Sequence, residues 1–323
     1  MAGFVRERHA GWEALDAALK EVESGVRLDP DALAALDRHY RRASADLAYA
    51  RTFFPGSRVT LYLNRLCGRA YRILYRRHRP PLAALHAFFW SEVPDAFWRC
   101  RHEVLVAGLV LCAGGLLGTV LTAADPEVAT LVLGEEAVQG LAEGRLWTDG
   151  LIAVVPPSVL GARIFTNNIS VAFTAFAGGL SAGLWTLFLM ALNGALLGIA
   201  FTAAAQHGLA PRLLDFVAAH GPVELSVIVL AGAAGLRVGG ALLSPGRLRR
   251  VDALKLRGRD GVRLALGGAP WLVVVGLVEG FVSPAAFLPT WLKGAVGLLL
   301  GLLLWTYLLR LGARGRGAPA AVG

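Results

Sequence analysis

The run VLVAGLVLCAGGLLGTVLTAA, residues 104–124, constrains the fold of this chain more than any other feature. It contains no charged residue, and as a helix rising 1.5 Å per residue it would cover about 30 Å, the hydrocarbon thickness of a bilayer. Backbone groups find no water at that depth, so a spanning segment must satisfy its own hydrogen bonds. The run therefore predicts a membrane-spanning helix.

Further apolar runs follow at about residues 165–182, 184–206, 222–243, 264–283 and 291–311. The 323-residue chain is 55% hydrophobic and only 17% charged, which is unusual for a soluble domain. We expect an all-α, polytopic helical membrane protein with about six transmembrane helices over residues 104–311. Little more than Ser-Ala-Gly separates the second and third runs. That pair could be two full crossings or a re-entrant hairpin.

The first 103 residues differ in composition, since they hold 17 of the 32 Lys and Arg and 12 of the 23 Asp and Glu. Asp29 is a plausible N-cap with Pro30 at the first helical position. Apolar side chains with roughly helical spacing follow at Leu33, Leu36, Tyr40, Leu47 and Phe54. We expect an N-terminal cytoplasmic helical domain over residues 1–103.

This domain ends in PLAALHAFFWSEVPDAFWRCRHE, residues 81–103, where aromatic and basic residues lie directly before the first span. Such a composition is typical of a helix in the membrane interface. It is equally typical of a packed helical bundle, and the two interpretations are compatible.

Charge alternates between the segments outside the spans. Residues 125–163 carry six acids against two arginines, whereas residues 244–263 carry seven basic and two acidic residues, and the tail 312–323 is basic. With six spans, the N-terminal region, residues 244–263 and the tail would all lie on the same side of the membrane. The positive-inside rule then predicts a bacterial cytoplasmic (inner) membrane protein with both termini in the cytoplasm and an acidic extracytoplasmic segment. The start has no apolar stretch typical of a signal peptide.

The net charge of +9 lies mostly beside apolar spans, which favours membrane lipids over nucleic acid as the partner. Small residues at Gly-xxx-Gly spacing let helices approach closely, which favours tight packing or a homo-oligomer. The expected packing positions are Gly194, Gly198, Gly235, Gly239, Gly276 and Gly280.

Several polar side chains fall inside the expected spans: Asn167, Asn168, Asn193, His220, Glu224, Arg237 and Glu279. The three asparagines are expected to hydrogen-bond between helices. Glu224 and Glu279 lie near the outer ends of their spans. They could be solvated at the interface, or form a proton or cation site, a salt bridge to a partner or a helix–helix hydrogen bond.

His220 and Glu224 are four residues apart and share one helix face. Arg237 follows Glu224 by 13 residues, about 20 Å along the axis and on another face, so the two cannot pair within one helix. Arg237 could instead reach the cytoplasmic interface, pair with another helix or bind a lipid phosphate.

Catalytic motifs are not expected. An intramembrane metalloprotease needs two histidines four residues apart, a glutamate between them and a third metal ligand. The motif around His220 contains no second histidine, and His207 lies in an expected loop without a partner motif. Ser226 lacks a nucleophile elbow. We expect no enzyme activity, no metal and no cofactor.

Three segments together resemble the stage II sporulation protein M family. They are FTNNISVAFTAFAGGLSAG (165–183), NGALLGIAFTAAAQHG (193–208) and HGPVELSVIVLAGAAGLRVGG (220–240). The motif positions are Asn167, Asn168, Asn193, Gly194, His220, Gly221, Glu224, Gly235 and Arg237. The resemblance covers roughly residues 40–310, and residues 125–163 match less clearly.

The resemblance implies a membrane scaffold that organises cell-envelope or peptidoglycan-remodelling partners without its own catalysis. The fold transfers better than a sporulation role. The alternative from the residues themselves is a transporter, channel or lipid-handling protein that uses the polar groups of spans two to five.

Overall fold

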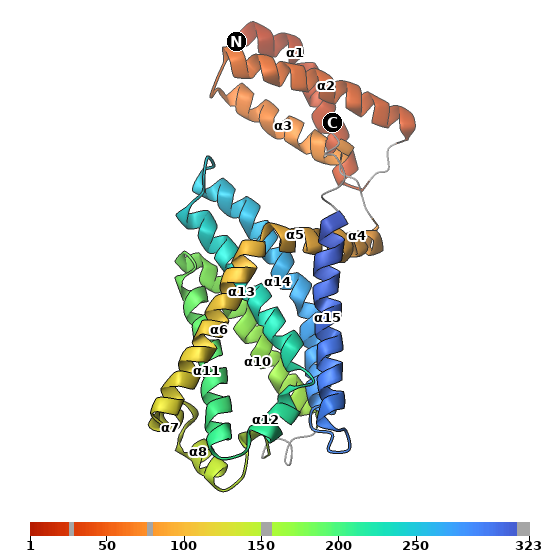
Figure 1. Ribbon diagram of the computed structural model, residues 1–323. Coiled ribbons are helices and arrows are strands. Elements are labelled where there is room, and N and C mark those ends of the chain that lie inside the picture. Colours follow the sequence, from red (N-terminus) through yellow and green to blue (C-terminus); the bar gives the residue numbers. More distant parts are fainter. Residues whose placement is uncertain (26–28, 76–79, 150–156, 315–323) are drawn as a thin grey trace. The chain divides into compact units, whose positions relative to one another are not determined.

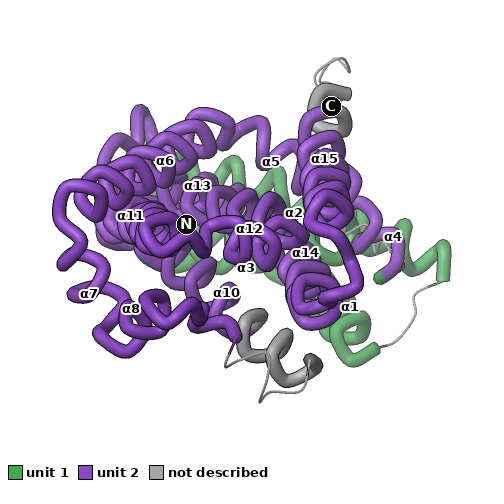
Figure 2. The backbone as a smooth tube through the Cα atoms, turned by 60° about the horizontal axis from the view of Figure 1, so that its bottom comes forward, with its two compact units in different colours: residues 1–81 green, residues 82–323 purple. Residues whose placement is uncertain are grey.

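The computed structural model describes residues 1–25, 29–75, 80–149 and 157–314; of residues 2, 157–165 and 310–314 it describes the backbone alone. The described residues form α-helices, with one π and one 3-10 segment and no strand (Figure 1). The predicted all-α polytopic class is confirmed. The chain divides into two compact units, Met1–Pro81 and Leu82–Gly323, which Figure 2 shows in separate colours.

The N-terminal unit consists of three helices, α1 (Ala2–Glu23), α2 (Pro30–Phe53) and α3 (Arg58–Tyr75). The predicted start of α2 is confirmed: the Asp29 carboxylate accepts a hydrogen bond from the backbone N–H of Ala32 at 2.7 Å, and Pro30 opens the helix. Leu36 and Leu47 are buried as their spacing predicts, whereas Leu33 is 47% exposed.

All three helices supply the core of this unit. Its buried members are Trp12, Leu15, Leu19, Leu36, Ala43, Leu47, Ala50, Leu63, Leu66, Cys67 and Ala70. Asp46 lies buried beside them and accepts hydrogen bonds from Trp12 Nε1 at 2.8 Å and from Arg8. A buried carboxylate is tolerated when it is paired in this way. The unit thus closes its own core without the long helices.

Among the described residues, six long helices build the second unit. They are α6 (Arg101–Ala124), α10 (Pro157–Ala177), α11 (Leu184–Gln206), α13 (Gly221–Leu243), α14 (Arg250–Phe281) and α15 (Thr290–Arg314). In each of these helices except α10, the described residues form a stretch that is long and apolar enough to cross a membrane. α10 begins eight residues before the expected run at 165, and its 21 residues cover about 31 Å, also enough to cross.

α13 is the central helix of this unit. It packs against α6, α10, α11, α14 and α15. In its most apolar 18-residue stretch 67% is buried, a larger share than in any other candidate span among the described residues. Its fifteen buried residues are mostly glycine, alanine and valine. Small side chains suit a helix surrounded on every side, because its neighbours can approach closely.

Close approach is visible at the glycines. A Cβ on Gly194 of α11 would lie 2.8 Å from the backbone nitrogen of Gly115 on α6 and closer still to Leu111 O, and Gly198 meets α6 in the same way. Gly235 and Gly239 of α13 lie against Ala175 and Gly183, at the α10–α11 reversal. Gly276 and Gly280 of α14 are also buried. Gly194, Gly198, Gly235 and Gly239 therefore lie in helix contacts within one chain.

α10 and α11 are joined by a tight reversal. The 3-10 segment η2 (Gly178–Ser181) is followed by Ala182 with φ 57° and Gly183 with φ 86°, both left-handed. Glycine adopts this conformation without strain, which explains its use at 183. Each of the two helices is long enough to cross the bilayer, which favours two crossings over a shallow hairpin.

The segment before α6 contains α4 (Pro81–Ala87), the π segment η1 (Phe88–Glu92) and α5 (Val93–Arg99). α5 packs against α14 and α15, and Val93 and Phe97 are buried in the same core as the long helices. Trp90 remains 56% exposed. Because α5 packs there, the compact N-terminal unit ends at Pro81 and not at residue 103.

The two ends of the second unit differ. α7 (Glu127–Leu133), α8 (Glu135–Ala142) and α12 (Ala210–Val217) gather at one end, and α5 lies at the other (Figure 1). The basic residues 250–263 are the first turns of α14, whose 32 residues cover about 48 Å and exceed the bilayer core. Acidic and basic segments therefore lie at opposite ends.

Candidate functional site

Three of the predicted polar residues meet where α13 begins and α14 ends. His220 Nε2 lies 3.7 Å from Glu224 Oε2 and 3.8 Å from Glu279 Oε1. The His220 side chain is 4% exposed, that of Glu279 7% and that of Glu224 21%. We call these three residues the His–Glu cluster. The shared face of His220 and Glu224 follows from their i,i+4 spacing, and the packing of α14 on α13 adds Glu279.

Neighbouring residues hold the imidazole of His220 in place. Its Nδ1 lies 2.8 Å from Ser283 Oγ. The centroid of its ring lies 5.5 Å from that of Phe216, and the two ring planes form an angle of 75°. Asn168 of α10 is 3% exposed and lies beside the Glu224 carboxylate, yet its Nδ2 has no partner at hydrogen-bond geometry. Glu279 Oε2 also has no partner. The cluster is thus ordered around His220 and leaves two buried polar atoms unsatisfied.

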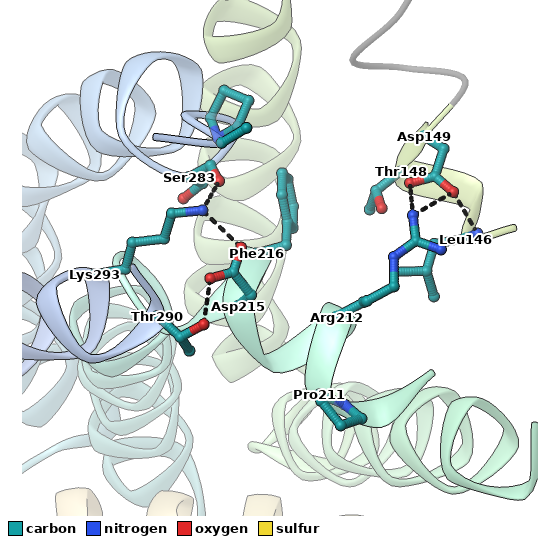
Figure 3. Close-up of a pocket in the computed structure, with 12 residues that line it drawn as sticks. Leu146, Thr148, Asp149, Pro211, Arg212, Asp215, Phe216, Ser283, Thr290 and Lys293 are labelled. Atoms are coloured by element: carbon teal, nitrogen blue, oxygen red, sulfur yellow. Dashed lines mark hydrogen bonds and ion pairs between the residues drawn. The ribbon is translucent and has the colours of Figure 1, made fainter. Parts of the chain in front are cut away.

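A cavity of about 520 Å³ lies next to this cluster. Ser283 and Phe216, which contact His220, both line it, together with residues of α12, of the α14–α15 turn and of segment 146–149 (Figure 3). Arg212 reaches Asp149 at 3.0 Å across the cavity wall. Charged groups of both signs therefore surround the cavity at the acidic end of the unit.

Lys293 is the most deeply buried cation at this cavity. It is 1% exposed, and its Nζ donates to Asp215 Oδ2 at 2.6 Å and to the Ser283 carbonyl at 2.9 Å (Figure 3). Thr290 also donates to Asp215, at 2.7 Å. Partial burial raises the pKa of Asp215, but the hydrogen bonds from Lys293 and Thr290 outweigh it and hold that pKa below its ordinary value. The carboxylate thus stays charged and pairs the lysine.

Arg237 lies at the other end of α13 and has partners on two helices. Its guanidinium contacts Glu103 of α6 at 3.0 Å and Asp260 of α14 at 3.3 Å. Arg99 of α5 reaches the same Asp260 at 2.9 Å. Of the alternatives left open by the sequence, the structure places Arg237 in pairs with other helices.

Arg263 extends this set by pairing with Glu92 at 2.8 Å and approaching Asp260 at 4.0 Å. We call the set the arginine network, and it balances three arginines against three acids: Arg99, Arg237, Arg263, Glu92, Glu103 and Asp260. Mutually paired charges are what a partly buried position requires. The network ties α5, α6, α13 and α14 together.

The asparagines behave differently from one another. Asn168 lies at the His–Glu cluster, whereas Asn167 is exposed. Asn193 donates from Nδ2 to Leu189 O of its own helix at 2.8 Å, so this bond is within α11 and not between helices. The sequence therefore predicted polar residues in the spans, but not which of them meet.

Other functional side chains were missed. Lys293 is the third residue of the last apolar run, 291–311, and a charge inside an apolar run was the signal that could have marked it. No hydrophobic periodicity in the sequence marked the other four residues as neighbours of α13; these are Asp215, Ser283, Glu103 and Asp260. Their contacts depend on helix pairing, which one sequence does not specify.

Two family models match this chain, one within each of its two compact units. A family model described as Stage II sporulation protein M matches residues 107–284, more than half of the chain. A second model, a domain of unknown function (DUF8413), matches residues 2–76 and coincides with the N-terminal unit. No curated protein and no solved structure matches the chain.

Proposed function

This membrane protein belongs to the stage II sporulation protein M family, and on that premise we propose that it is a scaffold of the bacterial inner membrane. In this proposal it organises cell-envelope or peptidoglycan-remodelling partners, has no catalysis of its own and keeps both termini in the cytoplasm. The membrane unit anchors the assembly and the N-terminal unit recruits the partner.

The observation that carries this proposal is the surface of the N-terminal unit. Its core is closed by its own three helices, yet two aromatic pairs remain outside: Tyr49 (46% exposed) with Phe53 (60%) on α2, and Tyr71 (57%) with Tyr75 (53%) on α3. The two ring centroids lie 4.5 Å apart in the first pair and 5.0 Å apart in the second. Exposed aromatic clusters on a polar surface are typical of protein interaction sites, where tyrosine often dominates binding.

Photo-crosslinking in native membranes tests this role. A benzophenone amino acid placed at Phe53 or Tyr71 of the full chain should form an adduct of discrete mass with an envelope protein. The same probe at Ala34, an exposed position of α2, should form none. Absence of adducts at both aromatic positions, together with solute flux through the purified protein in liposomes, would contradict the scaffold.

The alternative, a transporter, channel or lipid-handling protein, is favoured by a separate observation. The cavity of about 520 Å³ borders Lys293 and the His–Glu cluster, and polar groups at membrane depth commonly mark solute or ion pathways. This function predicts flux or lipid movement in liposomes that falls when Lys293 is replaced by methionine. A liposome assay without flux, and crosslinks at the aromatic pairs, would exclude it.

A further inference from the structure

The His–Glu cluster carries an inference beyond the scaffold. Its donor atoms, one imidazole nitrogen and one oxygen of each carboxylate, all lie within 4.8 Å of one another. The two distances from His220 Nε2, 3.7 Å and 3.8 Å, are too long for N–H···O hydrogen bonds, which cluster near 2.9 Å. The three atoms converge on a common point without bonding each other.

We propose that His220, Glu224 and Glu279 bind a divalent transition-metal ion, Zn²⁺ being the representative probe. Bonds of about 2.0–2.1 Å to a tetrahedral ion hold its ligand atoms about 3.3 Å apart. The two separations from His220 Nε2 are a few tenths of an ångström wider, and the carboxylate oxygens of Glu224 and Glu279 lie within 4.8 Å of each other. Small rotations of the side chains would close the three donors onto an ion.

Ser283 supplies the outer contact that such a site needs. A metal-binding histidine commonly donates the N–H of its other ring nitrogen to a fixed acceptor, which holds the ring and the tautomer. Here Nδ1 lies 2.8 Å from Ser283 Oγ, so an N–H donated to this hydroxyl leaves the Nε2 lone pair directed at the two carboxylates. An imidazole nitrogen and two carboxylate oxygens this close together repel each other when all three are unprotonated, and a cation between them would relieve that repulsion.

The local charge points to the same ligand. Among the described residues, neither Glu224 nor Glu279 pairs with an arginine or a lysine, and the nearby Lys293 is already held by Asp215 and the Ser283 carbonyl. Glu279 is 5% exposed and its Oε2 has no hydrogen-bond partner. A buried carboxylate without a counter-charge is costly, and a divalent ion would offset two of them at once.

The donor set selects the class of ion. Mg²⁺ and Ca²⁺ prefer sites built from oxygen with six or more ligands, whereas imidazole with two carboxylates suits zinc and its neighbours. Three protein ligands leave the fourth tetrahedral position to a water molecule or another ligand atom. The sequence predicted no metal here because Glu279 follows Glu224 by 55 residues and becomes a neighbour only when α14 packs on α13.

Metal binding by the purified full chain tests the proposal. The protein, carrying an affinity tag without histidine, is stripped with a chelator, exchanged into detergent or nanodiscs and titrated with Zn²⁺ by calorimetry and with Co²⁺ by visible absorption. We expect about one Zn²⁺ per chain at this cluster, the ligand-field bands of four-coordinate Co²⁺, and a rise in Tm with Zn²⁺.

Isosteric and matched variants assign the ion to these residues. Glu279→Gln and His220→Ala should bind Zn²⁺ about 100-fold more weakly or worse, since loss of an outer contact alone costs about 10–100-fold. Both should lose the Tm response. His207→Ala removes a histidine outside the cluster, whose Nδ1 lies 2.9 Å from Ala203 O, and should bind as the unmodified chain does.

Two results would overturn the proposal. One is the absence of Zn²⁺ and Co²⁺ binding by the unmodified chain. The other is unchanged binding in folded Glu279→Gln and Glu224→Gln. Circular dichroism and a monodisperse elution profile verify folding, and because the two Gln variants change different helices, misfolding of one leaves the other to decide.

Discussion

At the scale of single residues, Arg237 shows how this chain accommodates charge inside an apolar helix. Its guanidinium is held by Glu103 and Asp260 from two neighbouring helices, and the network balances its charges. Without Arg237, Glu103 would lose the ion pair that the structure gives it, whereas Asp260 would keep Arg99. The arginine therefore links neighbouring helices through its two terminal nitrogens, while its Nε is buried without a hydrogen-bond partner.

Replacing Arg237 by methionine should destabilise the second unit by about 3 kcal/mol, because Glu103 would be left partly buried without a counter-charge. The cost should lie near the lower end of the range for broken buried pairs, since Asp260 keeps Arg99. The midpoint of unfolding in mixed detergent and SDS micelles measures it. Arg259→Met, on the exposed side of α14, is the control and should change stability by less than about 0.5 kcal/mol.

Asp215 gives a pH-dependent prediction. Its pKa in the folded chain lies below the ordinary 3.8, so its carboxylate contributes stability that is complete above pH 4 and is lost as the pH falls through the folded pKa. Asp215→Asn should therefore lower the Tm clearly at pH 7, where buried Lys293 loses its partner, and the difference should shrink below pH 4. A difference that is constant from pH 7 to pH 3 would contradict this assignment.

At the scale of elements, the contact between α6 and α11 depends on glycine. Gly194 and Gly198 of α11 lie against the backbone of α6, where no side chain fits. The sequence predicted that small residues at this spacing would lie at helix contacts. It left open whether the partner was another helix or another chain, and the structure places these contacts within the chain.

Gly194→Ala should consequently destabilise the chain by about 1–3 kcal/mol, since its Cβ would meet Gly115 N at 2.8 Å and Leu111 O more closely. Gly258→Ala is the matched control. A Cβ there meets nothing within 4 Å, so the change should be neutral or stabilising by up to about 1 kcal/mol. Equal effects of the two changes on the unfolding midpoint would show that close approach is not the cause.

Elements were predictable where one segment carried its own signal. Apolar runs marked the long helices, and Asp29 with Pro30 marked the start of α2. The basic residues 250–263 were expected outside a span, and the structure adds that they are helical and continuous with α14, which is longer than the bilayer core requires. The meeting of Glu279 with His220, or of Arg237 with Glu103, depends on which helices pack, and no periodicity records that choice.

At the scale of the whole molecule, the acidic and basic segments lie at opposite ends of the second unit. In a background whose native cysteines are serine, Glu136→Cys should react with a membrane-impermeant maleimide in intact cells. Arg247→Cys should react only after permeabilisation, because the positive-inside rule places the basic segment in the cytoplasm. The opposite pattern would reverse the proposed orientation.

The division into two units has its own consequence. Residues 1–81 close a core from Trp12, Leu36, Leu63 and their neighbours, so we expect this fragment to fold alone. Circular dichroism should show a helical protein with a cooperative thermal transition. Asp46→Ala should abolish or strongly lower that transition, since it leaves Trp12 Nε1 buried without its acceptor. A non-cooperative melt of the unmodified fragment would contradict an independent unit.

The scaffold role is tested most directly by quantitative affinity capture of the full chain from native membranes, compared with a Tyr71→Ser/Tyr75→Ser variant. Each lost aromatic contact of about 1.4 kcal/mol weakens binding tenfold. We therefore predict a defined set of envelope proteins whose recovery falls at least about tenfold with the variant and is unchanged with Ala34→Ser. Equal recovery with both chains, or recovery of no envelope protein with the unmodified chain, would contradict the account.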